Sequence, residues 1–270
     1  MPTDALALAL GAAALHALWN LLLARSIDVQ AATGAALVIS VVVFAPVAAA
    51  TWRVEVSAWP FLVSSSALEL VYFALLAAAY RRADLSLVYP LTRGLAPLLV
   101  LAASVAFLGA GSSAVEAIGV FLVAAGIVLV RGLAGRADLR ALALTAAIAC
   151  CIAGYTLVDR YGIRHANAIA YLELVLIGPA VAYPLLLGVG RARRGLRPST
   201  AVSGVAMLGG YALVLVALRL ASAASVAAVR ESSIVIAVAL AAIVLREPVG
   251  RGRLAGAVLV AGGVATIALG

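Results

Sequence analysis

Long apolar runs follow one another along the whole chain and are separated by short polar connectors. A transmembrane helix needs about 20 predominantly apolar residues. Ten runs of this kind cover residues 5–24, 31–51, 59–80, 85–108, 114–130, 140–158, 167–189, 199–218, 221–245 and 253–269. The pattern therefore predicts an all-α integral membrane protein with ten transmembrane helices.

The second half of the chain repeats the spacing of the first half. When the sequence is shifted by 137 residues, residues 82–126 align with residues 219–263 without a gap. The matches include arginines and glycines as well as the abundant Ala, Leu and Val: Arg82 with Arg219, Arg93 with Arg230, Gly119 with Gly256 and Gly126 with Gly263. We therefore predict two five-helix repeats, residues 1–137 and 138–270. An odd number of spans per repeat makes the second inverted relative to the first, a plan found in many transporters.

Composition excludes a soluble domain. The chain is 66% hydrophobic and 11% charged, whereas soluble domains average roughly 45–50% apolar and about 25% charged residues. Residues 1–4 lack a basic segment, so we expect the first apolar run to be kept as a span rather than cleaved as a signal. Cys150 and Cys151 are neighbours within an apolar run, where cysteine usually behaves as a small hydrophobic residue.

The net charge of +8 comes entirely from arginine, because the 270 residues include no lysine. Thirteen of the 19 arginines fall in the odd-numbered connectors: Arg25, Arg81, Arg82, Arg131, Arg136, Arg140, Arg191, Arg193, Arg194, Arg197, Arg246, Arg251 and Arg253. Such a bias places these connectors in the cytoplasm and both termini outside. The basic residues therefore indicate topology and contact with the lipid bilayer, and no nucleic-acid partner is expected.

Two arginines lie inside predicted spans, Arg93 in 85–108 and Arg230 in 221–245. An intramembrane charge costs at least about 2.5–3.5 kcal/mol, so it normally faces a partner or a water-filled cavity. The two occupy matching positions of the two repeats. We interpret them as lining a central pathway and binding an anionic group.

The first span carries His16, Trp19 and Asn20 at positions i, i+3 and i+4, which share one helical face. This face forms either helix-to-helix hydrogen bonds or a cavity wall in which His16 titrates. Tyr155 and Asp159, one turn apart, either close one end of the path or anchor their span at the interface.

Buried carboxylates must be neutral or paired. Glu69 and Glu173 lie within spans, and we expect Glu69 to pair with Arg93 and Glu173 with Arg230. These pairs are either structural or include a carboxylate that exchanges a proton during transport. Glu231 follows Arg230 but points about 100° away from it on a helix, so it serves another partner.

The candidate site thus has two groups of residues. The proposed substrate-binding residues are Trp19, Asn20, Tyr72, Tyr89, Arg93, Tyr155, Arg230 and Ser232; the proposed proton-coupling residues are His16, Glu69, Glu173 and Glu231. No nucleotide-binding loop, nucleophile set or metal-ligand spacing occurs, so neither an enzyme nor a cofactor or metal is expected, and an ion or solute gradient would supply the energy. The glycines Gly119, Gly126, Gly256, Gly262 and Gly263 are assigned to helix packing.

The chain resembles the drug/metabolite transporter superfamily, in its EamA group. The features that carry this resemblance are residues 16–20 and 88–97, and the run from Leu245 through Glu247 to the glycine-rich last helix. The sequence departs from the group at Leu108–Ala110, where a Glu often follows Gly, and at Arg246, where Gly is usual. The resemblance implies a secondary transporter, often an exporter, of small metabolites in the plasma (cell inner) membrane.

Two other classes remain open at this point. An intramembrane lipid-modifying enzyme or scaffold would need a reactive group of residues or a large surface outside the membrane. A channel would show flux that does not saturate. Whether the protein forms a homodimer is also left open by the sequence.

Overall fold

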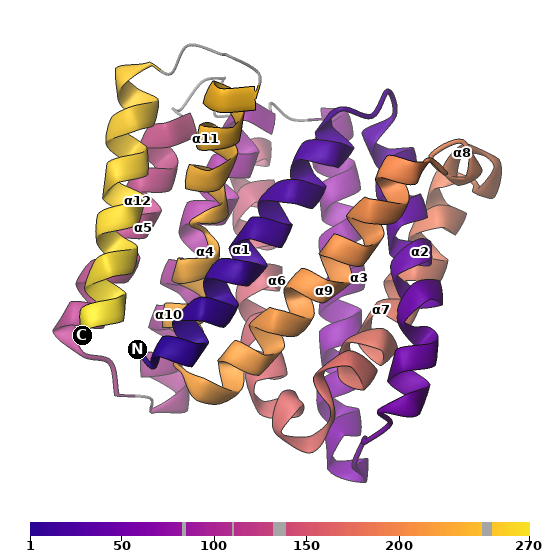
Figure 1. Ribbon diagram of the computed structural model, residues 1–270, viewed down its shortest axis with the longest axis horizontal. Helices are drawn as coiled ribbons and strands as arrows, with labels where there is room; N and C mark the ends of the chain where they lie inside the picture. Colours follow the sequence, from indigo (N-terminus) through magenta and orange to yellow (C-terminus); the bar gives the residue numbers. More distant parts are fainter. Residues whose placement is uncertain (83–84, 110, 132–138, 245–249) are drawn as a thin grey trace.

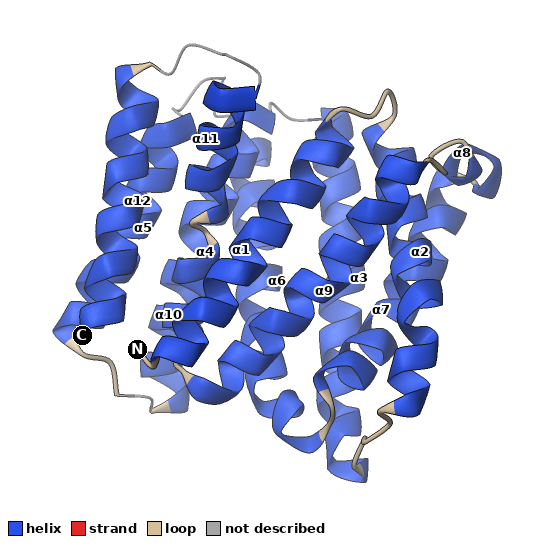
Figure 2. Ribbon diagram, viewed as in Figure 1, coloured by secondary structure: helices blue, strands red, loops and turns tan. Residues whose placement is uncertain are grey.

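The structure is a computed structural model that describes residues 1–82, 85–109, 111–131, 139–244 and 250–270, and the regular elements in these ranges are all helices (Figures 1 and 2). The long helices are α1 (Thr3–Ala24), α2 (Val29–Ala50), α3 (Trp59–Arg82), α4 (Leu85–Leu108), α5 (Ala114–Arg131), α6 (Leu139–Gly162), α7 (Ala168–Leu187), α9 (Pro198–Leu220) and α12 (Arg251–Leu269). The shorter ones are η1 (Val56–Ala58), η2 (Ile163–His165), α8 (Val189–Arg193), α10 (Ala223–Arg230) and α11 (Ser233–Val244).

Each of the ten predicted spans falls on one helix, except 221–245, which is divided between α10 and α11. Within the described ranges, eight helices are long and apolar enough to cross a membrane, and Ala114–Val130 of α5 is apolar but shorter. An all-α, multi-pass membrane protein is therefore confirmed.

The division of the ninth span was not predicted. Glu231 and Ser232 form a turn between α10 and α11, and their backbone amides donate to the carbonyls of Ala228 and Val229, three residues back, at 3.0 Å each. Such tightened turns are typical of helix ends. As a result Arg230 is the last residue of α10, within the bundle.

The bundle has two ends that differ in charge. We call one the termini end, because both chain ends lie there with the α2–α3, α4–α5, α6–α7 and α9–α10 connections (Figure 1). We call the other the basic end, because α1 ends and α2 begins there and the α7–α9 connection carries Arg191, Arg193, Arg194 and Arg197. Of the odd-numbered connectors predicted to be cytoplasmic, the two that the structure describes in full, α1–α2 and α7–α9, lie at the basic end.

Helices of the two halves of the chain pack against each other. The main partners are α5 with α12, α1 with α9, α3 with α6, and α2 with α7. Between membrane helices, small residues allow the close approach that stabilises packing. A Cβ atom on Gly126 would lie 2.7 Å from the Gly256 carbonyl oxygen, and one on Gly119 would lie 2.9 Å from that of Gly263. Four of the five glycines assigned to packing are thus in tight contacts, whereas Gly262 has no atom within 4 Å of such a Cβ.

Contacts between connectors hold the termini end together. Val54 and Ala166 form an antiparallel bridge, and the Asn167 amide donates to the Arg53 carbonyl at 2.7 Å. The Arg219 guanidinium donates to the Ile163 carbonyl at 2.6 Å. Beside the bridge, a hydrogen bond from His165 holds the pKa of the exposed Glu55 carboxyl below its usual value. These contacts tie the α2–α3 and α6–α7 connections to the end of α9.

Candidate substrate cavity

A cavity of about 570 Å³ lies among α1, α2, α3, α4, α6, α7, α9, α10 and α11. Its polar and aromatic lining residues are His16, Trp19, Asn20, Thr33, Glu69, Tyr72, Phe73, Thr92, Arg93, Tyr155, Tyr211 and Arg230. It reaches Ala24 and Val29 at the basic end, but toward the termini end its lining stops at Tyr155 of α6 and Val214 of α9. The cavity thus occupies the basic half of the bundle.

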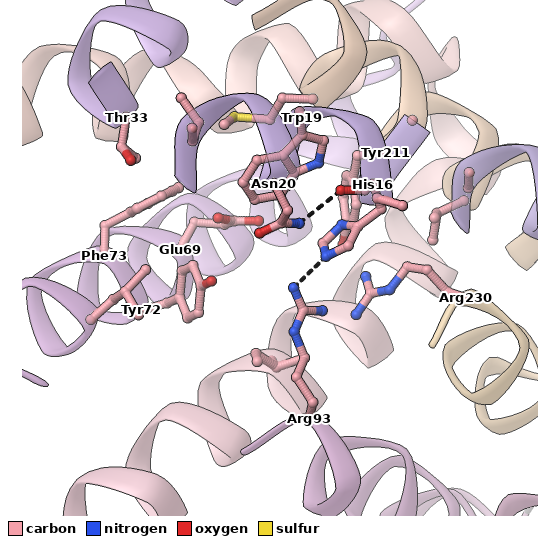
Figure 3. Close-up of a pocket in the computed structure, with 18 of the residues that line it drawn as sticks. His16, Trp19, Asn20, Thr33, Glu69, Tyr72, Phe73, Arg93, Tyr211 and Arg230 are labelled. Atoms are coloured by element: carbon pink, nitrogen blue, oxygen red, sulfur yellow. Dashed lines mark hydrogen bonds between the residues drawn. The ribbon is translucent and has the colours of Figure 1, made fainter. Parts of the chain in front are cut away.

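Arg93 of α4 and Arg230 of α10 both line the cavity, although their residues are only 7% and 5% exposed (Figure 3). Arg93 Nη1 donates to Glu231 Oε1 at 3.1 Å, and Arg230 Nη2 contacts the same oxygen at 3.4 Å. Both guanidinium groups therefore pair with Glu231, and the expected ion pairs of Arg93 with Glu69 and of Arg230 with Glu173 are wrong. Because Glu231 lies in the turn after α10, its side chain reaches α4, whereas the other two carboxylates lie on α3 and α7.

Two guanidinium groups thus share one carboxylate. The Nε atom of Arg230 is buried and has no hydrogen-bond partner among the described residues, and the same holds for Oε2 of Glu231. Glu231 is the carboxylate that both cations contact, and a buried positive charge is costly in a low-dielectric interior unless water or an anion approaches it. The cavity beside Arg93 and Arg230 gives an anion room to do so.

His16 lies against Arg93. Arg93 Nη2 and His16 Nε2 are 2.5 Å apart, and the dashed line in Figure 3 marks this bond. A guanidinium can only donate, so His16 Nε2 accepts and its imidazole is neutral, with the proton on Nδ1. The His16 ring meets the Trp19 ring edge-on at 4.8 Å, and Asn20 Nδ2 donates to the His16 carbonyl at 2.8 Å. The predicted polar face of the first span does line the cavity.

Glu69 enters the cavity from α3, whereas the two arginines enter from α4 and α10 (Figure 3). Aromatic rings lie around it: Tyr72 meets Tyr155 edge-on at 6.2 Å between ring centres, and Tyr155 meets Tyr211 at 6.0 Å. The cavity therefore presents two cations, one carboxylate and several aromatic rings to a bound molecule.

Several predicted residues lie elsewhere. Glu173 and Ser232 are buried but do not line the cavity, and Glu173 Oε2 and Ser232 Oγ have no hydrogen-bond partner within the described chain. Tyr89 belongs to α4, but its side chain is outside the described residues, as are residues 245–249. Conversely, sequence reasoning missed Thr33, Phe73, Thr92 and Tyr211, because one hydroxyl or ring in an apolar span gives no signal of its own.

No group of three or more His, Cys, Asp or Glu side chains in the described part of the chain could hold a metal ion.

Comparisons with known proteins agree with the fold, and one matches the second half of the chain to a family. Residues 139–269 match the EamA-like transporter family. A solved crystal structure is similar to the chain with a TM-score of 0.76 and 16% identity, covering 100% of this chain and 99% of the other. At this identity the likeness shows the fold alone. Comparison with curated proteins gave no match.

Proposed function

We propose, from the premise that residues 139–269 belong to the EamA-like transporter family, that this multi-pass membrane protein is a secondary active transporter of a small anionic or zwitterionic metabolite, such as an amino acid or an organic acid. Family membership suggests membrane transport rather than enzymatic activity. The single observation that supports the substrate class is that Arg93 and Arg230 line a cavity while sharing one carboxylate, Glu231.

An anionic group on the substrate would accept hydrogen bonds from the guanidinium N–H groups that Glu231 does not accept. A guanidinium carries five N–H donors in a planar fork that matches a carboxylate or phosphonate. Arg230 has one described acceptor, at 3.4 Å, and its Nε has none. We therefore assign the substrate's anionic group to the Arg230 side of the cavity, with Arg93 as its second contact.

The remaining walls suit a small carbon skeleton. Cavities for small molecules commonly measure about 300–1,000 Å³ and combine apolar walls with a few polar groups. Trp19, Tyr72 and Tyr155 would flank the skeleton, and Asn20 would offer an amide. An ionised Glu69 would in addition bind the ammonium group of a zwitterion.

Transport would be coupled to protons or to exchange, with efflux across the plasma (cell inner) membrane as the physiological direction. Protonation of Glu69 would change the charge of the cavity by one. Protonation of His16 would remove the lone pair that Arg93 now uses and so break that bond. Glu231 would act through the arginines, and Glu173, which lies off the cavity, is the weakest of the four proton-coupling candidates.

A reconstituted assay tests this function. Purified protein is screened by thermal shift against amino acids, organic acids, phosphonates and nucleotide sugars. The best ligand is then used, radiolabelled, in counterflow with proteoliposomes. We expect saturable counterflow that is lost in Arg230→Ala and kept in Arg193→Ala, since Arg193 is exposed on α8. Flux that neither saturates nor responds to unlabelled ligand inside the liposomes would indicate a channel and refute the proposal.

A further inference from the structure

A second buried acid, Asp159 of α6, lies just beyond the cavity toward the termini end. Its residue is fully buried. Tyr171 of α7 donates to its Oδ1 at 3.0 Å, and Tyr211 of α9 donates to its Oδ2 at 2.6 Å. One carboxylate thus connects three helices through two phenol hydroxyls.

The surroundings of Asp159 contain hydrogen-bond donors but no close cation. In the described part of the chain, no arginine or histidine nitrogen lies within 4.0 Å of its carboxylate. The titratable groups that face it are Tyr171 on α7, Tyr211 on α9 and Glu69 on α3. Arg93 of α4 and Arg230 of α10 face Tyr155, one turn earlier on α6. A buried carboxylate without a cation is stabilised by hydrogen bonds alone or binds a proton.

The position of Tyr211 connects this acid to the cavity. Tyr211 lines the cavity and also donates to Asp159, whereas Asp159 itself does not line it. The lining of α6 stops at Tyr155, one turn before Asp159. The Asp159–Tyr171–Tyr211 cluster therefore forms the floor of the cavity, between it and the termini end.

We infer that Asp159 is a proton-carrying gate residue: its ionised form holds Tyr171 and Tyr211 and closes the termini end, and its protonation releases one of the two phenols and lets that end open. The inference rests on the proposed transport function and assigns the gate to a residue outside the substrate cavity.

The hydrogen-bond count explains the direction. An ionised carboxylate accepts bonds at both oxygens, one from each phenol. A protonated carboxyl carries its proton on one oxygen, so one phenol must turn away or become an acceptor. Low pH would then weaken the link between α6 and either α7 or α9. The proton would enter from the termini end and leave toward the cavity through Tyr211 or water.

The test measures opening without any substrate. Spin labels are attached to Val56→Cys on η1 and Leu220→Cys on α9, which are 85% and 46% exposed at the termini end, in a Cys150→Ser, Cys151→Ser background. Pulsed electron paramagnetic resonance then gives the distance between the labels in nanodiscs from pH 5 to pH 8. We expect a short distance at pH 8 and a longer one at pH 5. In Asp159→Asn, whose side chain is always neutral, we expect the longer distance at every pH.

Two further variants make the result decisive. Asp4→Asn removes an exposed carboxylate at the same end, and its label distance should respond to pH as in the parent protein. Tyr211→Phe removes one of the two links and one donor to the ionised form. The distance at pH 8 should therefore lengthen part of the way, and the midpoint of the remaining response should move about one unit toward higher pH. Tyr211→Phe also replaces Asp159→Asn as the test should that variant fail to fold. A distance that ignores pH in the parent protein, an unchanged response in Asp159→Asn, or an unmoved midpoint in Tyr211→Phe would overturn the inference. Because no substrate is used, failure here and failure of counterflow can be told apart.

Discussion

At the scale of single residues, Glu231 determines how two arginines can be buried together. Removing one partner of a buried ion pair is far more damaging than removing an exposed one, because the remaining charge stays uncompensated. Glu231 is 1% exposed and contacts both guanidinium groups. Its loss is therefore expected to destabilise the folded state strongly.

We predict that Glu231→Gln lowers the free energy of unfolding by about 3 kcal/mol, since two buried cations would lose their only shared carboxylate. Thermal unfolding of the purified variant measures this loss. The exposed Glu55→Gln provides the control, with little expected change. An unfolding temperature of Glu231→Gln equal to that of the parent protein would show that the arginines are compensated elsewhere.

The sequence revealed these residues but not their partners. Arg93, Arg230, Glu69 and His16 were identified because each is a polar residue in an apolar run. The contact between Arg93 and Glu231 joins residues 138 positions apart, and it depends on how α4 packs against α10. Helix periodicity predicted that Glu231 points away from Arg230 toward another partner. The partner exists in Arg93, but Arg230 Nη2 also lies 3.4 Å from Glu231 Oε1, because the helix ends at Arg230 and Glu231 lies in the following turn. No pattern within one span shows which neighbouring helix Glu231 reaches.

At the scale of helices, the contact between α5 and α12 depends on glycine. The sequence predicted this use of small residues, and the structure distinguishes glycines in tight contact from Gly262, which faces open space. We predict that Gly126→Ala destabilises the protein by about 1–3 kcal/mol, because the new methyl group would overlap the α12 backbone. Gly262→Ala, in the same helix pair, should be neutral or slightly stabilising through helix propensity. Equal unfolding temperatures for the two variants would contradict this packing.

The start of α2 gives a prediction for pH. Asp28 caps this helix by accepting from the Ala31 amide at 3.1 Å and pairs with Arg191 of α8, with Arg191 Nε 2.7 Å from Oδ2. The bond from Arg191 is the main cause that lowers the pKa of Asp28. A lowered pKa in the folded state means that the stabilisation is present above the unfolded pKa of about 3.9 and is lost as the pH falls through the folded value.

We therefore expect Asp28→Asn, which keeps a good capping residue, to unfold at a lower temperature than the parent protein at pH 7. The difference should disappear as the pH falls below about 4. Differential scanning fluorimetry from pH 3 to pH 8 measures both curves. A difference that persists unchanged at pH 3 would mean that the ion pair is not its cause.

At the scale of the whole molecule, apolar run length predicted nearly the entire helical framework. It did not predict the interruption after Arg230, although residues 230–233 are all polar, because the length of an apolar run does not show whether such residues stay helical or form a turn. The helix partners also support the proposed inverted repeats, which stay a prediction. Because α8 is a short connector helix, α9 is the eighth span, and its counterpart in the first repeat is the third span, α3. Exchanging each span for its counterpart converts the pair α1 and α9 into α6 and α3, and the pair α2 and α9 into α7 and α3. All four pairs are in contact.

The arginine distribution predicts orientation, with the basic end in the cytoplasm. In a variant without Cys150 and Cys151, a membrane-impermeant maleimide should label Val56→Cys, at the termini end, in intact cells. It should label Arg193→Cys, at the basic end, only after the membrane is permeabilised. Labelling of Arg193→Cys in intact cells would reverse the orientation.

The proposed substrate class depends above all on whether Arg230 recognises the charge of the solute. Isothermal titration would compare the best ligand with an analogue whose anionic group is a neutral amide. Arg230→Ala suits this test because Glu231 keeps its bond to Arg93. We expect the parent protein and Arg193→Ala to bind the anion about tenfold more tightly than the amide, about 1.4 kcal/mol, and this ratio to fall toward one in Arg230→Ala. An undiminished ratio in Arg230→Ala would refute the role of Arg230 in binding the anionic group.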